Sequence, residues 1–365
     1  MSARRLIIIW IACLSALPLR DCKIKNKIGF LSPTRVFKII NEVNGDQNRT
    51  WRAGQTRFRS DQRAFAGSLG TKILSDREVA TMPVSPFPAL FTRKIAVPVE
   101  FDARVRWPNC STLHDIRDQG GCGSCWAHAV AESLSDRICI ASSHQNETVH
   151  ISVQDLMTCC TTCGGCHGGI VEYAFGHFVS VGIVTGGDYM TRKGCQSYSV
   201  APETWDRTIN ATPGCSKHCF AGYRTPYSRD LHKGSSWHVV AKLGSATSYP
   251  MNASAKMRTV VNDAVRDIQV EIMTNGPVTC SMRIYEDFQH YRTGVYAFVT
   301  GELLAGHAMK IIGWGVDEDS KLPYWLLANS WGTDWGEGGF ARVRRGVNEC
   351  GIESRINAGM PRKSY

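Results

Sequence analysis

Gln119-Gly120-Gly121-Cys122-Gly123-Ser124-Cys125-Trp126-Ala127 is the stretch that decides how this chain is interpreted, because it places a thiol between a glycine-rich turn and a helix. Behind Cys125, apolar side chains recur every four residues (Trp126, Val130, Leu134 and Ile138) and predict an amphipathic helix with one apolar face. The unpaired N–H groups and the positive dipole end at a helix start favour a thiolate over a thiol. The sequence therefore predicts that Cys125 can attack a carbonyl group.

The same stretch resembles the Cys-Gly-Ser-Cys-Trp signature of the papain-type cysteine proteases. The rest of the chain is most similar to the cathepsin B group of that family, and the similarity runs from about Val97 to Arg362. The matching segments are 101–104, 116–119, 135–140, 159–160, 306–308 and 350–354. This resemblance implies an α+β, papain-like two-lobed fold, with a helical lobe over about 97–235, a β-barrel-like lobe over about 236–365, and the active site in the cleft between them.

The pattern of expected elements agrees with two lobes. Ser152 and Asp155 form a capping-box-like helix start, and apolar spacing over 171–179 predicts another helix. From about Pro277 the pattern predicts strands, over 308–314, 324–329 and 339–344. Helices first and strands later indicate an α+β fold.

Charge argues against nucleic-acid binding although the formal net charge is +10. Residues 1–95 carry 17 basic and 6 acidic side chains, whereas residues 96–365 carry 25 basic and 26 acidic ones. A near-neutral body lacks the electrostatic footprint that DNA or RNA requires.

The N-terminus indicates the secretory pathway. Arg4 and Arg5 precede an apolar run over 6–17, which is typical of a signal peptide over residues 1–19 and too short to span a membrane; a buried helix or strand is the alternative. Fifteen cysteines fit an oxidising compartment. Five Asn-X-Ser/Thr patterns predict glycosylation, at Asn48, Asn109, Asn146, Asn210 and Asn252. We expect a lysosomal or extracellular protein, most simply a monomer.

Residues 20–96 form a separate basic segment that ends in the proline-rich run 82–88. Segments 41–45 and 50–54 resemble the cathepsin B pro-segment, which threads backwards through the active-site cleft and blocks it. We therefore expect an intramolecular inhibitor, released between Arg93 and Val97; a disordered linker is the alternative. The peptidase domain would then cover 97–365.

The resemblance assigns four catalytic residues. Cys125 is the nucleophile and His307, in Gly306-His307-Ala308, is its base. Asn329 would fix the tautomer and rotation of the imidazole, and Gln119 would donate to the oxyanion together with the backbone N–H of Cys125. His128, one helical turn from Cys125, is the competing histidine, and we interpret it as a packing residue.

Substrate contacts follow from the same resemblance. Gly168 and Gly169 would form a backbone ledge for an extended substrate, beside Gly123. Trp331 would cover the His307–Asn329 contact and form the wall on the leaving-group side. The remaining expected substrate-contacting residues are Ile170, Ala308 and Arg355.

The cysteine-rich cluster 159–167 has two interpretations. Cysteines separated by two residues can ligate zinc. In a secreted chain, however, disulfides are favoured, so we expect no metal and no cofactor. The resemblance implies five pairs: Cys110–Cys139, Cys122–Cys166, Cys159–Cys215, Cys160–Cys163 and Cys195–Cys219. Cys350 is expected to stay a thiol, and Cys280 has no assigned partner.

The chain departs from the family in three places. Cathepsin B removes dipeptides by means of an occluding loop with two adjacent histidines, but the corresponding region 198–213 is short and lacks that pair; only Arg207 is left that could bind a terminal carboxylate. Arg355 stands where the family often has a glutamate that recognises the second substrate residue before the cleaved bond, which disfavours arginine there. Residues 241–261 look like an insertion or a gene-model error.

The sequence thus predicts a cysteine endopeptidase made as a secreted zymogen, with weak or absent dipeptidyl carboxypeptidase activity. Its expected partners are protein and peptide substrates, its own pro-segment and cystatin-type inhibitors. A catalytically inactive secreted binding protein on the same fold is the alternative, although such a protein need not keep Cys125, His307, Asn329 and Gln119 together.

Overall fold

The protein is described from a computed structural model, which places residues 33–58, 62–73, 75–83, 94–142, 145, 148–206, 209, 211–243 and 254–362. The expected signal peptide lies outside the described residues. So do 84–93, next to the expected release site, and the possible carboxylate ligand Arg207.

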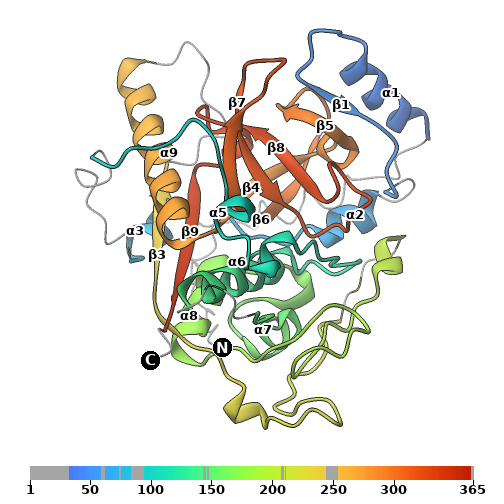
Figure 1. The fold of residues 1–365 in the computed structure, drawn as a ribbon. Helices are drawn as coiled ribbons and strands as arrows, with labels where there is room; N and C mark the ends of the chain where they lie inside the picture. The colour runs from blue at the N-terminus through green and yellow to red at the C-terminus, as the bar shows by residue number, and fades with distance from the viewer. Residues whose placement is uncertain are drawn as a thin grey trace, which may run out of the picture.

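The first half of the peptidase region is helical, as the sequence predicts. The helix α6 (Cys125–Ala141) carries the expected nucleophile at its first residue. Ser152 caps α7 (Val153–Cys159) by accepting a hydrogen bond from the backbone N–H of Asp155, and α8 (Val171–Ser180) follows. Together these helices enclose their own apolar core, in the lower part of Figure 1.

The second half is a mixed sheet with one long helix, α9 (Ala255–Asn275). Along the sheet the strand order is β1-β5-β8-β7-β6-β4-β9-β3, and β2 pairs with β6. The strands are β1 (Trp51–Ala53), β2 (Phe101–Asp102), β3 (Gly234–Lys242), β4 (Val278–Tyr285), β5 (Tyr291–Tyr296), β6 (Leu303–Val316), β7 (Pro323–Ala328), β8 (Phe340–Arg344) and β9 (Arg355–Pro361). Only β5 and β8 pair in parallel among the named strands of the described chain.

Two expectations about the lobes need correction. The β-barrel-like lobe is an open mixed sheet, because β1 and β3 form its two edges and do not pair with each other. The peptidase N-terminus, expected in the helical lobe, contributes β2 to the sheet and continues into the short helix α5 (Ala103–Arg106). The α+β class itself is confirmed.

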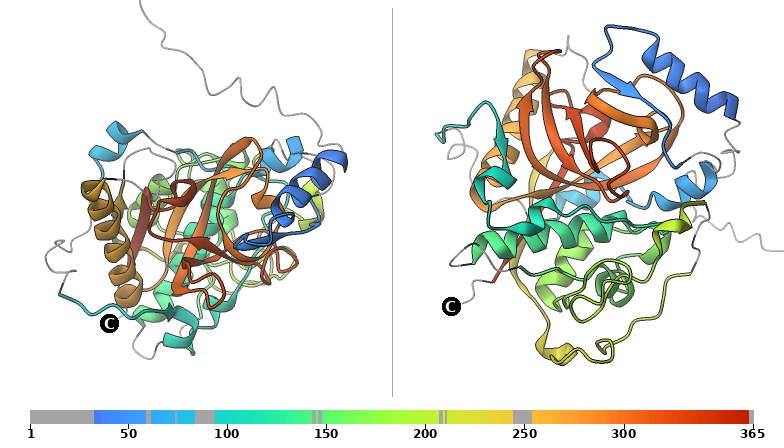
Figure 2. Two further views of the ribbon diagram at one scale, coloured as in Figure 1. Left: turned by 90° about the horizontal axis from the view of Figure 1, so that it is seen from above. Right: turned by 45° about the vertical axis from the view of Figure 1, so that its right-hand side comes forward.

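Helix α6 also differs from its expected amphipathic pattern, since it is buried from Cys125 to Cys139 on all sides. Figure 2 shows it running along the boundary between the helices and the sheet. Its polar side chains are paired instead of solvated: Asp136 Oδ2 lies 2.8 Å from Lys310 Nζ of β6, and Arg137 lies 2.7 Å from Glu271 of α9. Buried charges require such partners, and an apolar periodicity does not reveal them.

The expected pro-segment is folded onto the sheet lobe. It contains α1 (Pro33–Asn44), β1, α2 (Gln62–Ser68) and α3 (Asp76–Ala80). β1 adds to the sheet by pairing with β5, and Trp51 is buried against Tyr296 at a ring distance of 5.0 Å. In Figure 1, α1 and β1 lie beside β5 at the upper right. The described part of this segment is therefore ordered, which excludes the disordered linker there.

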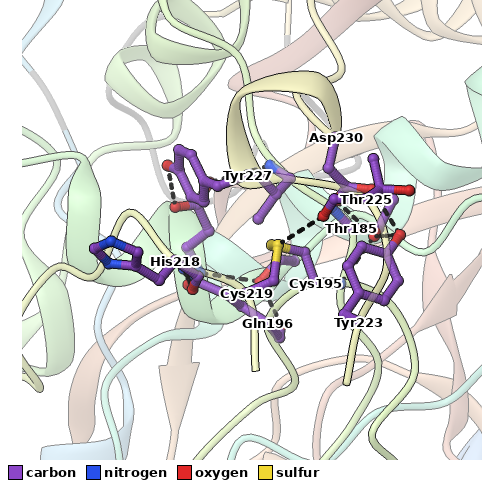
Figure 3. Close-up of a disulfide and its surroundings, with 12 residues drawn as sticks. Thr185, Cys195, Gln196, His218, Cys219, Tyr223, Thr225, Tyr227 and Asp230 are labelled. Carbon is purple, nitrogen blue, oxygen red and sulfur yellow. Dashed lines mark hydrogen bonds between the residues drawn. A yellow bond between two sulfur atoms is a disulfide. The ribbon is translucent and has the colours of Figure 1, made fainter. Parts of the chain in front are cut away.

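All five expected cysteine pairs lie at disulfide distance. Figure 3 shows the Cys195–Cys219 pair, whose surroundings are held by polar contacts. There Asp230 accepts hydrogen bonds from the backbone and hydroxyl of Thr185 and from Tyr223, each at 2.7 Å. These hydrogen bonds hold the long connection between α8 and β3 in place.

The cysteines of the 159–167 cluster are all used in these pairs, which removes the thiolates that zinc would need. Cys280 and Cys350 lie outside any disulfide, and both are buried. Burial raises the pKa of the Cys280 thiol to about 12, so it is an inert core group at neutral pH.

The remaining expectations concern the possible insertion, the glycosylation acceptors and membrane-spanning helices. The possible insertion is not one loop: residues 241–242 end β3, 254–261 cap and begin α9, and 244–253 lie outside the described residues. Asn48 and Asn109 are exposed, whereas Asn146, Asn210 and Asn252 lie outside the described residues. Among the described helices, none is both long and apolar enough to cross a membrane.

Candidate active site

Cys125 is fully buried at the N-terminus of α6, after the turn that Ser124 ends. Burial alone would raise the pKa of this thiol. The charge of His307 and contacts with His307, the Thr71 hydroxyl and the Ala308 backbone outweigh burial and lower the pKa to about 7. Near neutral pH a large fraction of Cys125 is therefore thiolate, which is the nucleophilic form.

His307 and Asn329 meet through the pairing of β6 with β7. His307 lies in β6, Asn329 directly follows β7, and His307 Nε2 lies 2.8 Å from Asn329 Oδ1. Because Oδ1 can only accept, Nε2 carries the hydrogen and Nδ1 is left for the thiol. Nδ1 has no hydrogen-bond partner among the described residues. The ring of Trp331 covers this contact, with its centroid 4.7 Å from that of His307.

Gln119 is buried beside the nucleophile with a fixed amide orientation. Its Oε1 accepts a hydrogen bond from Ser330 Oγ at 2.7 Å. Its Nε2 donates to the carbonyl oxygen of Cys122 at 2.8 Å and to that of Ser68 at 2.7 Å. Ser68 belongs to the expected pro-segment, so a pro-segment carbonyl uses the donor that the sequence assigned to the oxyanion.

The pro-segment lies across the interlobe surface, which we define by Gly169 on the helical lobe and Gly306 in β6. Gly169 N donates to Gly70 O at 2.5 Å, and Lys72 N donates to Gly169 O at 2.9 Å. Thr71 N donates to Gly306 O at 3.1 Å. Thr71 pairs with Gly169 in parallel, and its Oγ1 lies 3.3 Å from Cys125 Sγ. A polypeptide chain therefore already covers the Cys125 thiol.

Glycine is needed where this segment approaches. A Cβ on Gly168 would lie 2.6 Å from Gly70 O, and Gly168 has a φ of +100°. A Cβ on Gly123 would lie 3.1 Å from Gly67 O of the same segment and 2.6 Å from Cys166 O. Side chains at these positions would push a bound backbone away.

The other expected contact residues surround the same surface. Ile170 caps the start of α8, and Ala308 is buried in β6 next to His307. Arg355 begins β9 and is mostly buried, with its Nε 3.9 Å from Glu172 Oε1. Burial raises the pKa of the Glu172 carboxyl, while Arg355 opposes that rise. The charge of Arg355 is therefore partly compensated, which the sequence alone did not indicate.

His128 is not part of this cluster of hydrogen bonds. Its Nδ1 contacts the Ser124 carbonyl at 3.1 Å, and its ring packs edge-on against Tyr198 at 4.8 Å. Burial lowers the pKa of His128 to about 3, so it is neutral. These contacts agree with a packing role.

Sequence reasoning missed several residues at the site. Asp118 precedes Gln119, and its Oδ1 accepts from Trp205 Nε1 at 2.8 Å. Trp205 lies in the short 3-10 helix η4 (Pro202–Asp206), inside the shortened loop region. The acidic residue beside Gln119 and the tryptophan in the shortened loop were the sequence signals that could have identified these two residues. Nothing in the sequence marked Ser68 or Thr71, whose roles depend on how the pro-segment lies.

Comparisons with known proteins show similarity to cysteine proteases. The family profile described as Papain family cysteine protease matches residues 97–360. Cathepsin B-like cysteine proteinase 5 of Caenorhabditis elegans is 45% identical over 284 residues, which cover 73% of this chain and 75% of that protein. Cathepsin B-like cysteine proteinase 4 of the same organism is 42% identical over 278 residues, covering 73% and 76%.

Solved structures show the same fold. The structure described as proCathepsin B S9 from Trypanosoma congolense superposes with a TM-score of 0.72 and 29% identity, covering 92% of this chain and 99% of that one. Digestive procathepsin L2 from Tenebrio molitor has a TM-score of 0.64 at 18% identity, covering 95% of each chain, and shows similarity of fold alone.

Proposed function

The chain belongs to the papain family of cysteine proteases, and on that premise we propose that it is an endopeptidase made as a zymogen. The observation that carries the proposal is the joint placement of Cys125, His307 and Asn329. The thiol pKa is lowered to about 7 by His307, whose far nitrogen is held 2.8 Å from the Asn329 amide oxygen.

The reaction follows from this geometry. Cys125 Sγ attacks the carbonyl carbon of the peptide bond while His307 holds the proton that the leaving amine needs. The C–N bond breaks as the amine takes that proton, which leaves an acyl-enzyme thioester. His307 then removes a proton from water, the hydroxide attacks the thioester, and the thiolate departs with the acid product released.

Gln119 supplies the oxyanion donor in this proposal. Its amide is buried, fixed by Ser330, and already donates to a carbonyl oxygen, that of Ser68. When the pro-segment leaves, the same N–H is available to a developing oxyanion, together with the backbone N–H of Cys125. Removing a donor of this kind typically reduces kcat by about 100-fold or more.

The zymogen form rests on the pro-segment contacts. Residues 20–96 would be the inhibitory segment and 97–365 the enzyme, since the described part of 20–96 covers Cys125 and extends the sheet. Release between Arg93 and Val97 would uncover the interlobe surface. The similarity to a procathepsin B structure supports this arrangement.

The endopeptidase preference rests on the loop region 198–213. Its described part includes the short helix η4, and the region contains no histidine. A substrate chain can therefore continue past the nucleophile without meeting the paired histidines that would bind its terminal carboxylate. Mass spectrometry of one long peptide tests this: internal cleavage should dominate, and stepwise loss of dipeptides would refute the preference.

We also propose that Arg355 disfavours arginine as the second residue before the cleaved bond. Its guanidinium is mostly buried, and its Nε lies 3.9 Å from Glu172 Oε1. Like charges brought together at such a site oppose binding.

Delivery through the secretory pathway to the lysosome or the exterior is the proposed localisation. It is supported by the five disulfide pairs and by the exposed acceptors Asn48 and Asn109. Protein substrates and cystatin-type inhibitors would bind a monomer at the interlobe surface.

A thiol-directed epoxide tests the activity most simply. Processed enzyme should be labelled at Cys125 with loss of peptidase activity, and Cys125→Ser should be neither labelled there nor active. A processed protein that leaves Cys125 unlabelled and cleaves no peptide would instead favour the inactive binding protein.

A further inference from the structure

Arg57 of the pro-segment is bound at one end of the active site. Its guanidinium lies 2.5 Å from Asp118 Oδ2 and also donates to the Trp331 carbonyl oxygen. Its Cζ lies 5.3 Å from the ring centroid of Trp205, within the range of a cation–π contact. Asp334 lies further off, at 3.6 Å, and is largely exposed. These contacts form a binding site for a cation.

The carboxylate of the site is oriented by contacts within the enzyme. Asp118 Oδ1 accepts from Gly120 N at 2.9 Å and from Trp205 Nε1 at 2.8 Å, which orients the carboxylate. Only Oδ2 is used by Arg57. The Asp118 side chain is 15% exposed with Arg57 in place. Removal of the pro-segment therefore leaves an oriented carboxylate oxygen without its cation.

The walls of the site are aromatic. The rings of Trp205 and Trp331 lie 6.4 Å apart at a nearly perpendicular angle. In the precursor Phe58, next to Arg57 in the pro-segment, covers both rings, at 4.8 Å from Trp205 and 5.5 Å from Trp331. Its departure would uncover them. An apolar wall beside a carboxylate suits a long basic side chain, because its methylene groups also need cover.

The position of this site identifies which part of a substrate would reach it. Trp331 stacks on His307, and Asp118 is adjacent to the oxyanion donor Gln119. The backbone-pairing residue Gly169 binds a different part of the pro-segment, Gly70 to Lys72. Since His307 protonates the leaving amine, the Trp331 side of the thiol faces the residues that follow the cleaved bond.

We propose that Asp118, Trp205 and the Trp331 carbonyl form a subsite for a basic side chain located after the cleaved bond, with arginine preferred over lysine. The inference rests on the proposed peptidase function and adds a substrate preference to it. Arginine is preferred because its planar guanidinium can bond the carboxylate and the carbonyl while it stacks on Trp205. A lysine ammonium can make the ion pair without the stacking.

Internally quenched peptides with one cleavable bond test the proposal on processed enzyme. Arginine, lysine, glutamine or glutamate is placed in turn at the first, second or third residue after the bond. At one of these positions we expect kcat/KM to fall in the order arginine, lysine, glutamine, glutamate, with arginine about tenfold above glutamine. Product masses establish that the same bond is cut in each peptide.

Variants assign the preference to the site. Asp118→Asn should reduce the arginine-to-glutamine ratio to about one, and Trp205→Leu should reduce the arginine-to-lysine ratio. Asp319→Asn removes the same charge from an exposed position outside this cluster and should keep the ratios of the unchanged enzyme. Each ratio is taken within one enzyme, so a general loss of activity cancels.

The peptidase function and the subsite can be tested separately. A fluorogenic peptide whose leaving group is a coumarin has no residue after the bond, so its hydrolysis tests the peptidase function alone. If it is hydrolysed while the arginine-to-glutamine ratio of the unchanged enzyme is one or less at all three positions, the subsite is overturned and the peptidase function stands. If neither substrate type is cleaved, the peptidase function is wrong. Should Asp118→Asn not fold, an unchanged arginine-to-lysine ratio in Trp205→Leu contradicts the subsite.

Discussion

Replacing Gly70 by alanine should open the active site of the precursor without disturbing the enzyme itself. A Cβ at Gly70 would lie 2.0 Å from the carbonyl oxygen of Gly123 and 2.6 Å from its carbonyl carbon. Both atoms are backbone atoms in the turn before Cys125, so no side-chain rotation relieves the clash. An ordinary contact requires the pro-segment to move by roughly 1.4 Å.

The cost follows from the hydrogen bonds that such a movement breaks. They are Gly169 N to Gly70 O at 2.5 Å, Lys72 N to Gly169 O at 2.9 Å and Thr71 N to Gly306 O at 3.1 Å. Each such bond contributes about 1 kcal/mol net, so the three together contribute about 3 kcal/mol. That free energy corresponds to about a 100-fold larger population of precursor with an uncovered Cys125.

The assay is the rate at which a thiol-directed reagent labels Cys125 in the intact precursor at neutral pH. Labelling of a Cys125→Ser precursor is subtracted to remove the other thiols. Gly70→Ala should be labelled about 100-fold faster than the unchanged precursor. The control is Gly214→Ala, where an added Cβ meets nothing within 4 Å. If Gly70→Ala is labelled no faster than this control, the pro-segment does not protect the nucleophile in the way described.

Three further substitutions test other parts of the account. Asn329→Ala removes the 2.8 Å partner of His307 and should lower kcat/KM about 10- to 100-fold, with little change in KM; an unchanged kcat would exclude an orienting role. Arg355→Glu should raise kcat/KM for coumarin peptides with arginine two residues before the bond, and no improvement would contradict the specificity proposal. Lys310→Met leaves Asp136 without its 2.8 Å partner and should destabilise the protein by about 3–5 kcal/mol; chemical denaturation with an unchanged midpoint would contradict this.

The sequence predicted the parts of the site that lie in short local motifs. Cys125 begins a helix, as its glycine-rich turn and apolar spacing indicated, and the segment of His307 forms a strand. The structure brings His307 together with Asn329 because β6 and β7 pair side by side. The resemblance also implied the cysteine pairs, which lie at disulfide distance.

Features that depend on distant contacts could not be predicted. Glu132 lies off the predicted apolar face of α6, yet it is buried 3.9 Å from Lys310, and burial raises its pKa to about 8. The expected barrel-like lobe is an open sheet because closure depends on pairing between edge strands, and one edge is β1 of the expected pro-segment. Arg355 looked like a lone cation because its partner Glu172 is far away in sequence.

The central claim is that the imidazole of His307 lowers the pKa of the Cys125 thiol between the two lobes. Titration of this thiol tests it. The thiolate absorbance of the folded precursor, minus that of Cys125→Ser, should rise with pH around an apparent pKa of about 7. Because burial alone raises the pKa of a thiol, His307→Ala should move this transition above the ordinary value of about 8.5. A transition that stays in place in His307→Ala, or that occurs near 9 in the unchanged protein, would contradict the account.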